Sequence, residues 1–340
     1  MFATVAASRK GATEMPDNHI CSLSVFLDLT PNDELDTPAF QPKEKIYVEP
    51  RFTHCLLAGL FVCSPVNLPA APPAISITVL TTFDYPGVGN STTPHSINSL
   101  GDCTGTYVDP GGVTRGFVRL ANGTFSPPLV DPNDTGHLTF PLGINTSRLV
   151  CGYYLNSTFH GFFLSGRTYS TFDLPAEIST FIVNVNDAGH FVGVADNGIT
   201  PQGFINVAGT TTLFSVPGAI ITQANSLNAT DQIVGTYDDG VTFHGYFRAA
   251  NGSLTFPLDP PGSTFTNLLA INDGGVVVGR YTGTDGHDHG ALFKRPNSFV
   301  SFDFPGATDT ALNGINNSRI ISGRYTDSGG VSHGFLAQVH

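Results

Sequence analysis

The sequence predicts an all-β protein, a six-bladed β-propeller of four-stranded blades in which an N-terminal strand completes the last blade. The first supporting observation is composition. Between Ile75 and His340 the chain has one lysine, Lys294, and one glutamate, Glu177. Exposed helix positions usually carry these two residue types. Threonine, valine, phenylalanine, tyrosine and glycine dominate instead, which is typical of strands joined by tight turns.

The second observation is a repeated unit of about 44 residues, the length of one propeller blade. An apolar residue followed by asparagine recurs at Ile97-Asn98, Ile144-Asn145, Val185-Asn186, Leu227-Asn228, Ile271-Asn272 and Ile315-Asn316. Three further markers follow in a fixed order. They are Gly-x-Tyr, as in Gly279–Tyr281, His-Gly-Phe, as in His333–Phe335, and Phe-Asp-x-Pro-Gly, as in Phe302–Gly306. Six linked copies predict six blades.

Each copy predicts four short strands in order. The first strand ends in the apolar-Asn pair, and a tight turn such as Asn272–Gly275 follows it. The second strand carries Gly-x-Tyr and ends at a turn such as Asp327–Gly330. The third carries His-Gly-Phe and precedes a turn such as Asn251–Ser253. The fourth strand leads into Phe-Asp-x-Pro-Gly, whose proline and glycine are typical turn residues.

The third observation concerns closure of the ring. The chain stops at Val339-His340, just after the third strand of the sixth copy. A strand-like segment without a copy of its own, Ile75–Phe83, precedes the first copy. We expect this segment to complete the sixth blade, because a closed ring leaves no unpaired sheet edge. An open solenoid would instead require distinct capping units at both ends.

Residues 1–74 form a separate segment that holds most of the lysine and glutamate. We predict that this lead is disordered, because its stretch 30–50 is polar and unpatterned. Within it, 51–74 resembles a secretory signal, with a positive flank, the apolar run Cys55–Cys63 and a tail of small residues. This predicts export to the periplasm or the extracellular space. The alternative is an unstructured lead with one short apolar patch.

Charge and cysteine content exclude several classes of protein. The net charge of −12 disfavours nucleic-acid binding. No apolar run reaches the ~18 residues of a membrane-spanning helix. The five cysteines lack zinc-ligand spacing and predict no disulfide framework. Cys103 and Cys151 fall one position apart in the aligned copies, so we expect no bridge between them. We expect a monomer without metal or cofactor.

The repeated residues are expected to be structural, because a function rarely needs six copies of a residue. The histidines of the third marker are His160, His244, His289 and His333, and the other two copies have Arg115 and Gln202. Arginine and glutamine share hydrogen-bond donation with histidine but not its affinity for metals. This position therefore predicts hydrogen bonds between strands. The asparagine of each first strand is expected to bond its own turn.

A binding site is expected where one copy departs from the others. The turn Thr284–His289 of the fifth copy holds more ligand-type groups than its counterparts. Asp285, His287 and Asp288 are therefore the candidate binding residues, and a solvated hairpin turn is the alternative. The chain has no Gly-x-Ser-x-Gly, His-Glu-x-x-His or phosphate-loop motif, so we predict no catalytic residue.

The markers Phe302–Ala307, Gly314–Asn316, Gly323–Asp327 and His333–Leu336 resemble those of the bacterial HAF-type extracellular repeat family. The resemblance covers about Ile75 to His340 and implies an exported propeller without a defined activity. Our first hypothesis is a secreted, non-enzymatic propeller that binds a glycan, a surface polymer or a protein. The alternatives are a hydrolase or lyase with an Asp/His site at the axial channel, and a scaffold without ligand. Convergence of non-repeated Asp, His, Arg or Tyr at one channel mouth would favour the enzyme.

Overall fold

The computed structural model describes residues 75–87, 91–294 and 298–340. The predicted disordered lead and its signal-like segment, 1–74, lie outside these residues, so both stay predictions. Residues 74–340 form one compact unit, and the part that the structure describes is built from strands and turns. Among the described residues, no helix is long and apolar enough to cross a membrane.

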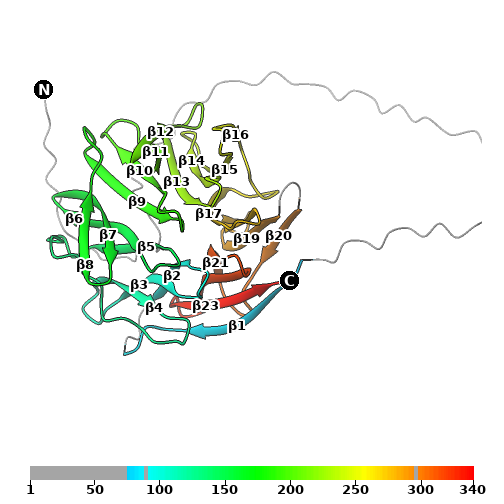
Figure 1. Ribbon diagram of the computed structural model, residues 1–340. Helices are drawn as coiled ribbons and strands as arrows, with labels where there is room; N and C mark the ends of the chain where they lie inside the picture. The colour runs from blue at the N-terminus through cyan, green and yellow to red at the C-terminus, as the bar shows by residue number, and fades with distance from the viewer. Residues whose placement is uncertain (1–74, 88–90, 295–297) are drawn as a thin grey trace, which may run out of the picture. The chain divides into compact units, whose positions relative to one another are not determined.

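The strands form six antiparallel sheets, which we number as blades 1 to 6 in chain order (Figure 1). Blade 1 consists of β2 (Thr92–Ile97), β3 (Cys103–Val108) and β4 (Thr114–Arg119). Blade 2 consists of β5 (Thr139–Ile144), β6 (Val150–Asn156), β7 (Thr158–Ser165) and β8 (Thr168–Phe172). Blade 3 consists of β9 (Ser179–Val185), β10 (Phe191–Asp196), β11 (Gln202–Val207) and β12 (Thr210–Phe214). Blade 4 consists of β13 (Ile221–Leu227), β14 (Ile233–Asp238), β15 (Phe243–Arg248) and β16 (Leu254–Thr255). Blade 5 consists of β17 (Phe265–Ile271), β18 (Val276–Thr282), β19 (Asp288–Lys294) and β20 (Ser298–Phe302). Blade 6 consists of β21 (Asp309–Ile315), β22 (Ile320–Thr326) and β23 (Ser332–Val339), together with β1 (Ile77–Phe83).

The blades close into a ring around their first strands. Each first strand contacts the first strand of the next blade, from β2 and β5 round to β21 and β2. Strand order within a blade follows the chain, so the later strands lie progressively farther out. The fold is therefore the predicted six-bladed β-propeller (Figure 1).

The predicted closure by the N-terminal strand is confirmed. Strand β1 pairs with β23 in antiparallel register, from Ile77 opposite Val339 to Phe83 opposite Gly334. Ile77 also packs against the buried cluster of blades 5 and 6. The clasp therefore gives the outer edge of β23 a hydrogen-bonded partner.

Blade 1 differs from the prediction in its outermost strand. In place of a fourth strand it has two isolated bridges, which join Arg119 to Phe125 and Gly116 to Leu129. The segment between the bridges contains Pro127 and Pro128, and proline cannot donate the hydrogen bonds of a ladder. The sheet of this blade consequently has three strands.

The core lies between blades and depends on the glycines of Gly-x-Tyr. The aromatic side chain of the third strand lies over this glycine and is fully buried at Phe117, Phe162, Phe204, Tyr246 and Phe335. In blade 4, a Cβ on Gly235 would overlap the carbonyl oxygen of Gln223 and lie 2.7 Å from the Tyr246 ring. Only glycine therefore allows the backbone of the first strand and the aromatic ring to approach this position so closely.

Candidate functional site: the asparagine ring

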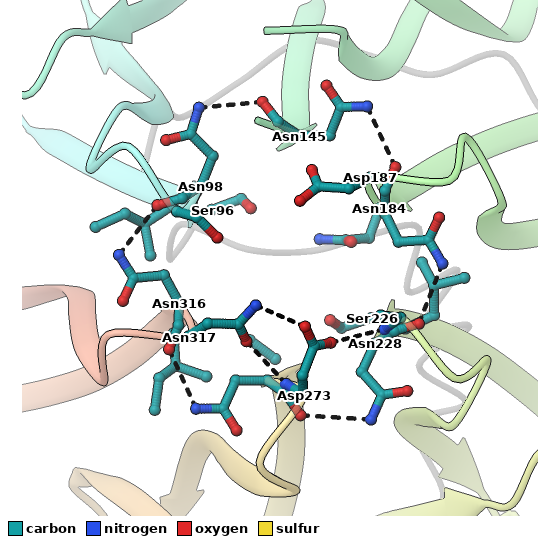
Figure 2. A pocket seen from close by; sticks show the side chains of 18 of the residues that line it. Ser96, Asn98, Asn145, Asn184, Asp187, Ser226, Asn228, Asp273, Asn316 and Asn317 are labelled. Carbon is teal, nitrogen blue, oxygen red and sulfur yellow. Dashed lines mark hydrogen bonds between the residues drawn. The ribbon is translucent and has the colours of Figure 1, made fainter. Parts of the chain in front are cut away.

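The six repeated asparagines form a closed ring of hydrogen bonds around the axis (Figure 2). The side-chain Nδ2 of each donates to the backbone carbonyl oxygen of the asparagine in the next blade. The distances are 3.0 Å for Asn98 to Asn145, 3.2 Å for Asn145 to Asn186, 3.1 Å for Asn186 to Asn228, 3.4 Å for Asn228 to Asn272, 3.1 Å for Asn272 to Asn316 and 3.0 Å for Asn316 to Asn98. The last bond links blade 6 to blade 1, so the ring is also closed at its axis.

The same asparagines hold the turns that follow the first strands. Oδ1 of Asn98 accepts hydrogen bonds from the backbone N–H groups of Leu100 and Asp102, at 3.0 and 2.9 Å. Oδ1 of Asn272 likewise accepts from Val276 at 3.0 Å. The predicted bond to the residue's own turn is confirmed. The bond to the next blade was not predicted, although a residue present once in every blade was the available signal.

We expect Asn272→Ala to destabilise the propeller by about 1–3 kcal/mol, the usual cost of leaving buried polar groups without partners. Asn272 is 5% exposed, and alanine removes both the bond to Asn316 and the bond from Val276. The measurement is urea denaturation followed by tyrosine fluorescence. Asn251→Ala is the matched control, because Asn251 makes the same type of turn bond to Ser253 at an exposed site. Equal effects of the two substitutions would contradict a stabilising role of the ring.

A polar hollow of about 80 Å³ opens at the axis beside this ring. Every first strand has a register shift shortly before its asparagine, as between Ala224 and Ser226 in β13. The residue two positions before the asparagine is small or polar in all blades: Ser96, Gly143, Asn184, Ser226, Ala270 and Gly314. These short side chains leave the axis open. Four of these residues, Ser96, Asn184, Ser226 and Ala270, line the hollow.

Two carboxylates stand at the mouth of the hollow. Asp187 accepts hydrogen bonds from the backbone N–H and the hydroxyl of Thr146 in the preceding blade, at 2.7 and 2.8 Å. Asp273 accepts from the backbone N–H of Ala229 at 2.7 Å and from Nδ2 of Asn317 at 2.6 Å. The residues lining the hollow include no lysine, arginine or histidine. The mouth is therefore acidic and held rigidly between blades.

Two lining side chains have donors and acceptors to spare. Asn184 reaches toward the middle of the hollow (Figure 2), and Ser96 is 9% exposed. Neither side chain has a hydrogen-bond partner within the part of the chain that the structure describes. Because polar groups in such positions normally bond to water or ligand, both side chains are available to form hydrogen bonds with a ligand in the hollow.

The candidate residues lie elsewhere: Asp285 and His287 are in the turn between β18 and β19, and Asp288 is the first residue of β19. Asp288 forms ion pairs with Arg280 and, at 3.6 Å, with Arg324. Asp285 is 55% exposed and lies 3.2 Å from His289, and His287 is 53% exposed. None of the three lines the hollow. Among the described residues, no group of three or more His, Cys, Asp or Glu is arranged to hold a metal ion. A binding role of this turn stays a prediction.

The predicted bonds between strands at the repeated histidines are confirmed. The partner is the aspartate near the end of the fourth strand. The Nδ1–carboxylate distances are 2.9 Å for His160 and Asp173, 2.6 Å for His244 and Asp259, 2.7 Å for His289 and Asp303, and 3.0 Å for His333 and Asp84. Gln202 donates to Ser215 at 3.0 Å in blade 3. In blade 1 Arg115 instead pairs with Asp109 at 3.2 Å.

We expect the difference in stability between wild type and His333→Gln to shrink as the pH rises. Burial lowers the pKa of His333. Its hydrogen bonds with Asp84 and Asp327, and the negative charges of these two residues, raise the pKa by more, so that it lies above 6.5. The protonated ring therefore stabilises the fold below pH 6.5, and this contribution is lost as pH rises through the raised pKa. Urea denaturation at about pH 5.5 and about pH 8 measures the difference.

His333→Leu serves as the comparison, because leucine cannot donate to Asp84. It should be less stable than His333→Gln at both pH values, since glutamine already fills this position at Gln202. A difference between wild type and His333→Gln that is independent of pH would argue against the ion pair.

Cys103 and Cys151 are both free and buried, as expected from their positions in the aligned copies. Burial raises the pKa of the Cys103 thiol to about 12; the charge of Arg119 lowers this pKa slightly, and the charge of Asp102 raises it slightly. The pKa of Cys151 is raised as well, again by burial. Both thiols are therefore protonated packing groups near neutral pH.

Comparison with known proteins finds likeness to solved structures only at low sequence identity. No family model and no curated protein matches it. Aleuria aurantia lectin in complex with Fucα1-6GlcNAc has a TM-score of 0.49 at 10% identity, over 74% of this chain and 94% of the lectin. TolB from Acinetobacter baumannii gives 0.46 at 12%, over 74% and 56%. A lectin from Burkholderia pseudomallei gives 0.43 at 11%, over 71% and 79%. At such identities the likeness concerns the fold alone.

Proposed function

We propose that the protein is an exported, non-enzymatic binding propeller whose axial hollow binds a hydroxylated ligand, a glycan. Export, to the periplasm or the extracellular space, rests on the signal-like segment within 51–74 and on the resemblance to the HAF-type extracellular repeat family. Membership of that family is part of the proposal. The ligand class rests on the chemistry of the hollow.

The observation that carries the proposal is the set of groups around the mouth. They are amides, hydroxyls and carboxylates, with Asn184 and Ser96 free to form further hydrogen bonds. Amides and hydroxyls both donate to and accept from sugar hydroxyls, and carboxylates accept from them. A sugar hydroxyl would replace ordered water on these groups without loss of hydrogen bonds.

The size and charge of the hollow restrict which glycans we expect it to bind. The volume of the hollow, about 80 Å³, has room for a few water-sized groups, so it admits part of a sugar rather than a whole oligosaccharide. The hollow therefore takes one hydroxylated edge of a ligand whose remainder lies across the mouth. Asp187 and Asp273 repel anions, so we propose neutral or amino sugars rather than sulfated or uronic acids.

Two non-repeated aspartates, Asp187 and Asp273, do converge at this mouth, but their surroundings favour binding over hydrolysis or elimination. General acid–base chemistry needs a titratable donor and acceptor within hydrogen-bond reach of the substrate. No histidine lines the hollow. Its two carboxylates already accept hydrogen bonds from neighbouring blades. The four repeated histidines pair with aspartates near the ends of the fourth strands. A scaffold without ligand is the remaining alternative, and a binding experiment separates it from the proposal.

The test is a glycan array probed with the full-length protein. We expect signals on neutral or amino glycans that Asn184→Leu abolishes, since leucine keeps the shape of asparagine without its hydrogen bonds. Asn251→Ala, at an exposed turn far along the blade, should leave the signals unchanged. Absence of any signal would favour the scaffold, and signals restricted to sulfated glycans would contradict the proposed ligand class.

A further inference from the structure

Four large aliphatic side chains are exposed on neighbouring turns of blades 3 and 4. Ile178 is 56% exposed, Ile199 87%, Ile220 51% and Val241 89%. Ile199 and Val241 lie in the turns between the second and third strands of their blades. Ile178 and Ile220 directly precede the first strands β9 and β13. We call these four residues the aliphatic face.

Backbone hydrogen bonds hold the turns that carry these four side chains next to one another. Ile178 N–H donates to the carbonyl of Asp196 at 2.7 Å, beside the turn that carries Ile199. Thr222 N–H donates to Pro201 at 3.0 Å, which joins that turn to the segment carrying Ile220. Ile220 N–H in turn donates to Asp238 at 2.8 Å, beside the turn that carries Val241.

The aliphatic face departs from the repeat. The residues equivalent to Ile178 and Ile220 are Thr264 in blade 5 and Thr308 in blade 6, and each makes the same backbone bond. The fold therefore tolerates a polar side chain at this position. Contiguous exposed apolar groups are rare on soluble monomers and mark interaction surfaces, so packing does not account for isoleucine in blades 3 and 4.

The surroundings of the aliphatic face are acidic. Between residues 168 and 247 the chain has no lysine or arginine. The turns that carry the face also carry Glu177, Asp196, Asp238 and Asp239. A protein with a net charge of −12 repels its own copies, and repulsion is strongest where carboxylates gather. Charge complementarity thus points to a cationic partner.

We propose that the aliphatic face and its four carboxylates form a docking surface for a cationic amphipathic segment of a partner protein. Apolar side chains of the segment pack on the isoleucines and Val241, and its lysines or arginines lie beside the carboxylates. The surface is separate from the proposed glycan site. Ile178 precedes the start of β9, and the asparagine ring lies at the far end of the same strand, beyond Val185.

The probe is a labelled model peptide with leucine and lysine at helical spacing, titrated into the full-length protein and followed by fluorescence anisotropy. Two further peptides replace leucine with serine or lysine with glutamate. We expect binding of the leucine–lysine peptide alone, and about tenfold weaker binding to the double variant Ile199→Thr/Val241→Thr. Glu177→Lys should also weaken binding, and the weakening should diminish at high salt.

Leu80→Thr is the control, because Leu80 is 54% exposed on β1 in blade 6. It should bind the peptide like wild type. Thermal melting verifies that each variant is folded. The proposal is overturned if the serine–lysine peptide binds equally well, since charge alone would then suffice. It is equally overturned if the double variant binds unchanged. Wild-type self-association in sedimentation that the double variant abolishes would assign the surface to a second copy instead.

Discussion

Asp288→Ala is expected to destabilise the protein by about 3–5 kcal/mol, the usual cost of removing one partner of a buried ion pair. The carboxylate of Asp288 lies between blades 5 and 6, where its side chain is 14% exposed. It pairs with Arg280, 11% exposed, and with Arg324, 7% exposed. Without Asp288, the guanidinium of Arg280 loses its anion in a site that water reaches poorly.

Asp285→Ala is the matched control for this prediction, because it removes the same group from an exposed position in the same turn. Urea denaturation of both variants gives the comparison. Between blades 2 and 3 the corresponding space is filled by the rings of Phe159 and Phe181, 5.0 Å apart. The ion pairs of blade 5 thus replace an aromatic contact. Equal stabilities of the two variants would show that Asp288 belongs to a solvated turn.

Removal of β1 is expected to cost about 5 kcal/mol or more, from lost apolar burial and strand hydrogen bonds. A chain that starts at Asp84 lacks the pairing with β23. It also lacks the packing of Ile75 and Ile77 on the core and the contact of the Phe83 ring with Arg119 at 4.5 Å. The bare edge of β23 should promote aggregation as well.

The reference for this deletion is a chain that starts at Ile75 and keeps β1. Differential scanning calorimetry of the two chains measures the melting temperature and the cooperativity of unfolding. We expect the longer chain to melt cooperatively and the shorter one to melt much lower or to aggregate. Identical melting curves would show that the asparagine ring alone closes the propeller.

The fold could be predicted because its determinants recur at a fixed spacing. The apolar-Asn pair, the glycines and the His-Gly-Phe marker each hold one contact in every blade, so repetition reveals them. A threonine is the first or second residue of each first strand in the same way, at Thr92, Thr139, Thr180, Thr222, Thr266 and Thr310. In blade 3 the hydroxyl of Thr180 accepts from Leu174 N–H at 3.0 Å. This marker was visible in the sequence and was missed.

The candidate site was harder to predict, because its members come from different blades and belong to no motif. Asn184 becomes a lining residue only when the ring brings its strand to the axis beside Ser96. Asp288 was predicted to be a binding residue because of its neighbours in the sequence, yet its carboxylate forms ion pairs with arginines of two blades. The outermost strand of blade 1 was predicted from the repeat alone. That prediction was wrong, because the local Pro127-Pro128 pair cannot form the hydrogen bonds of a strand.

The most direct test of the central claim, that the axial hollow binds a hydroxylated ligand without converting it, is calorimetric titration with a glycan selected on the array. Wild type should bind one equivalent, Asn184→Leu should not bind, and chromatography should recover the glycan intact. Undiminished binding to Asn184→Leu would place the site elsewhere, and a cleaved or eliminated glycan would show that the propeller is an enzyme.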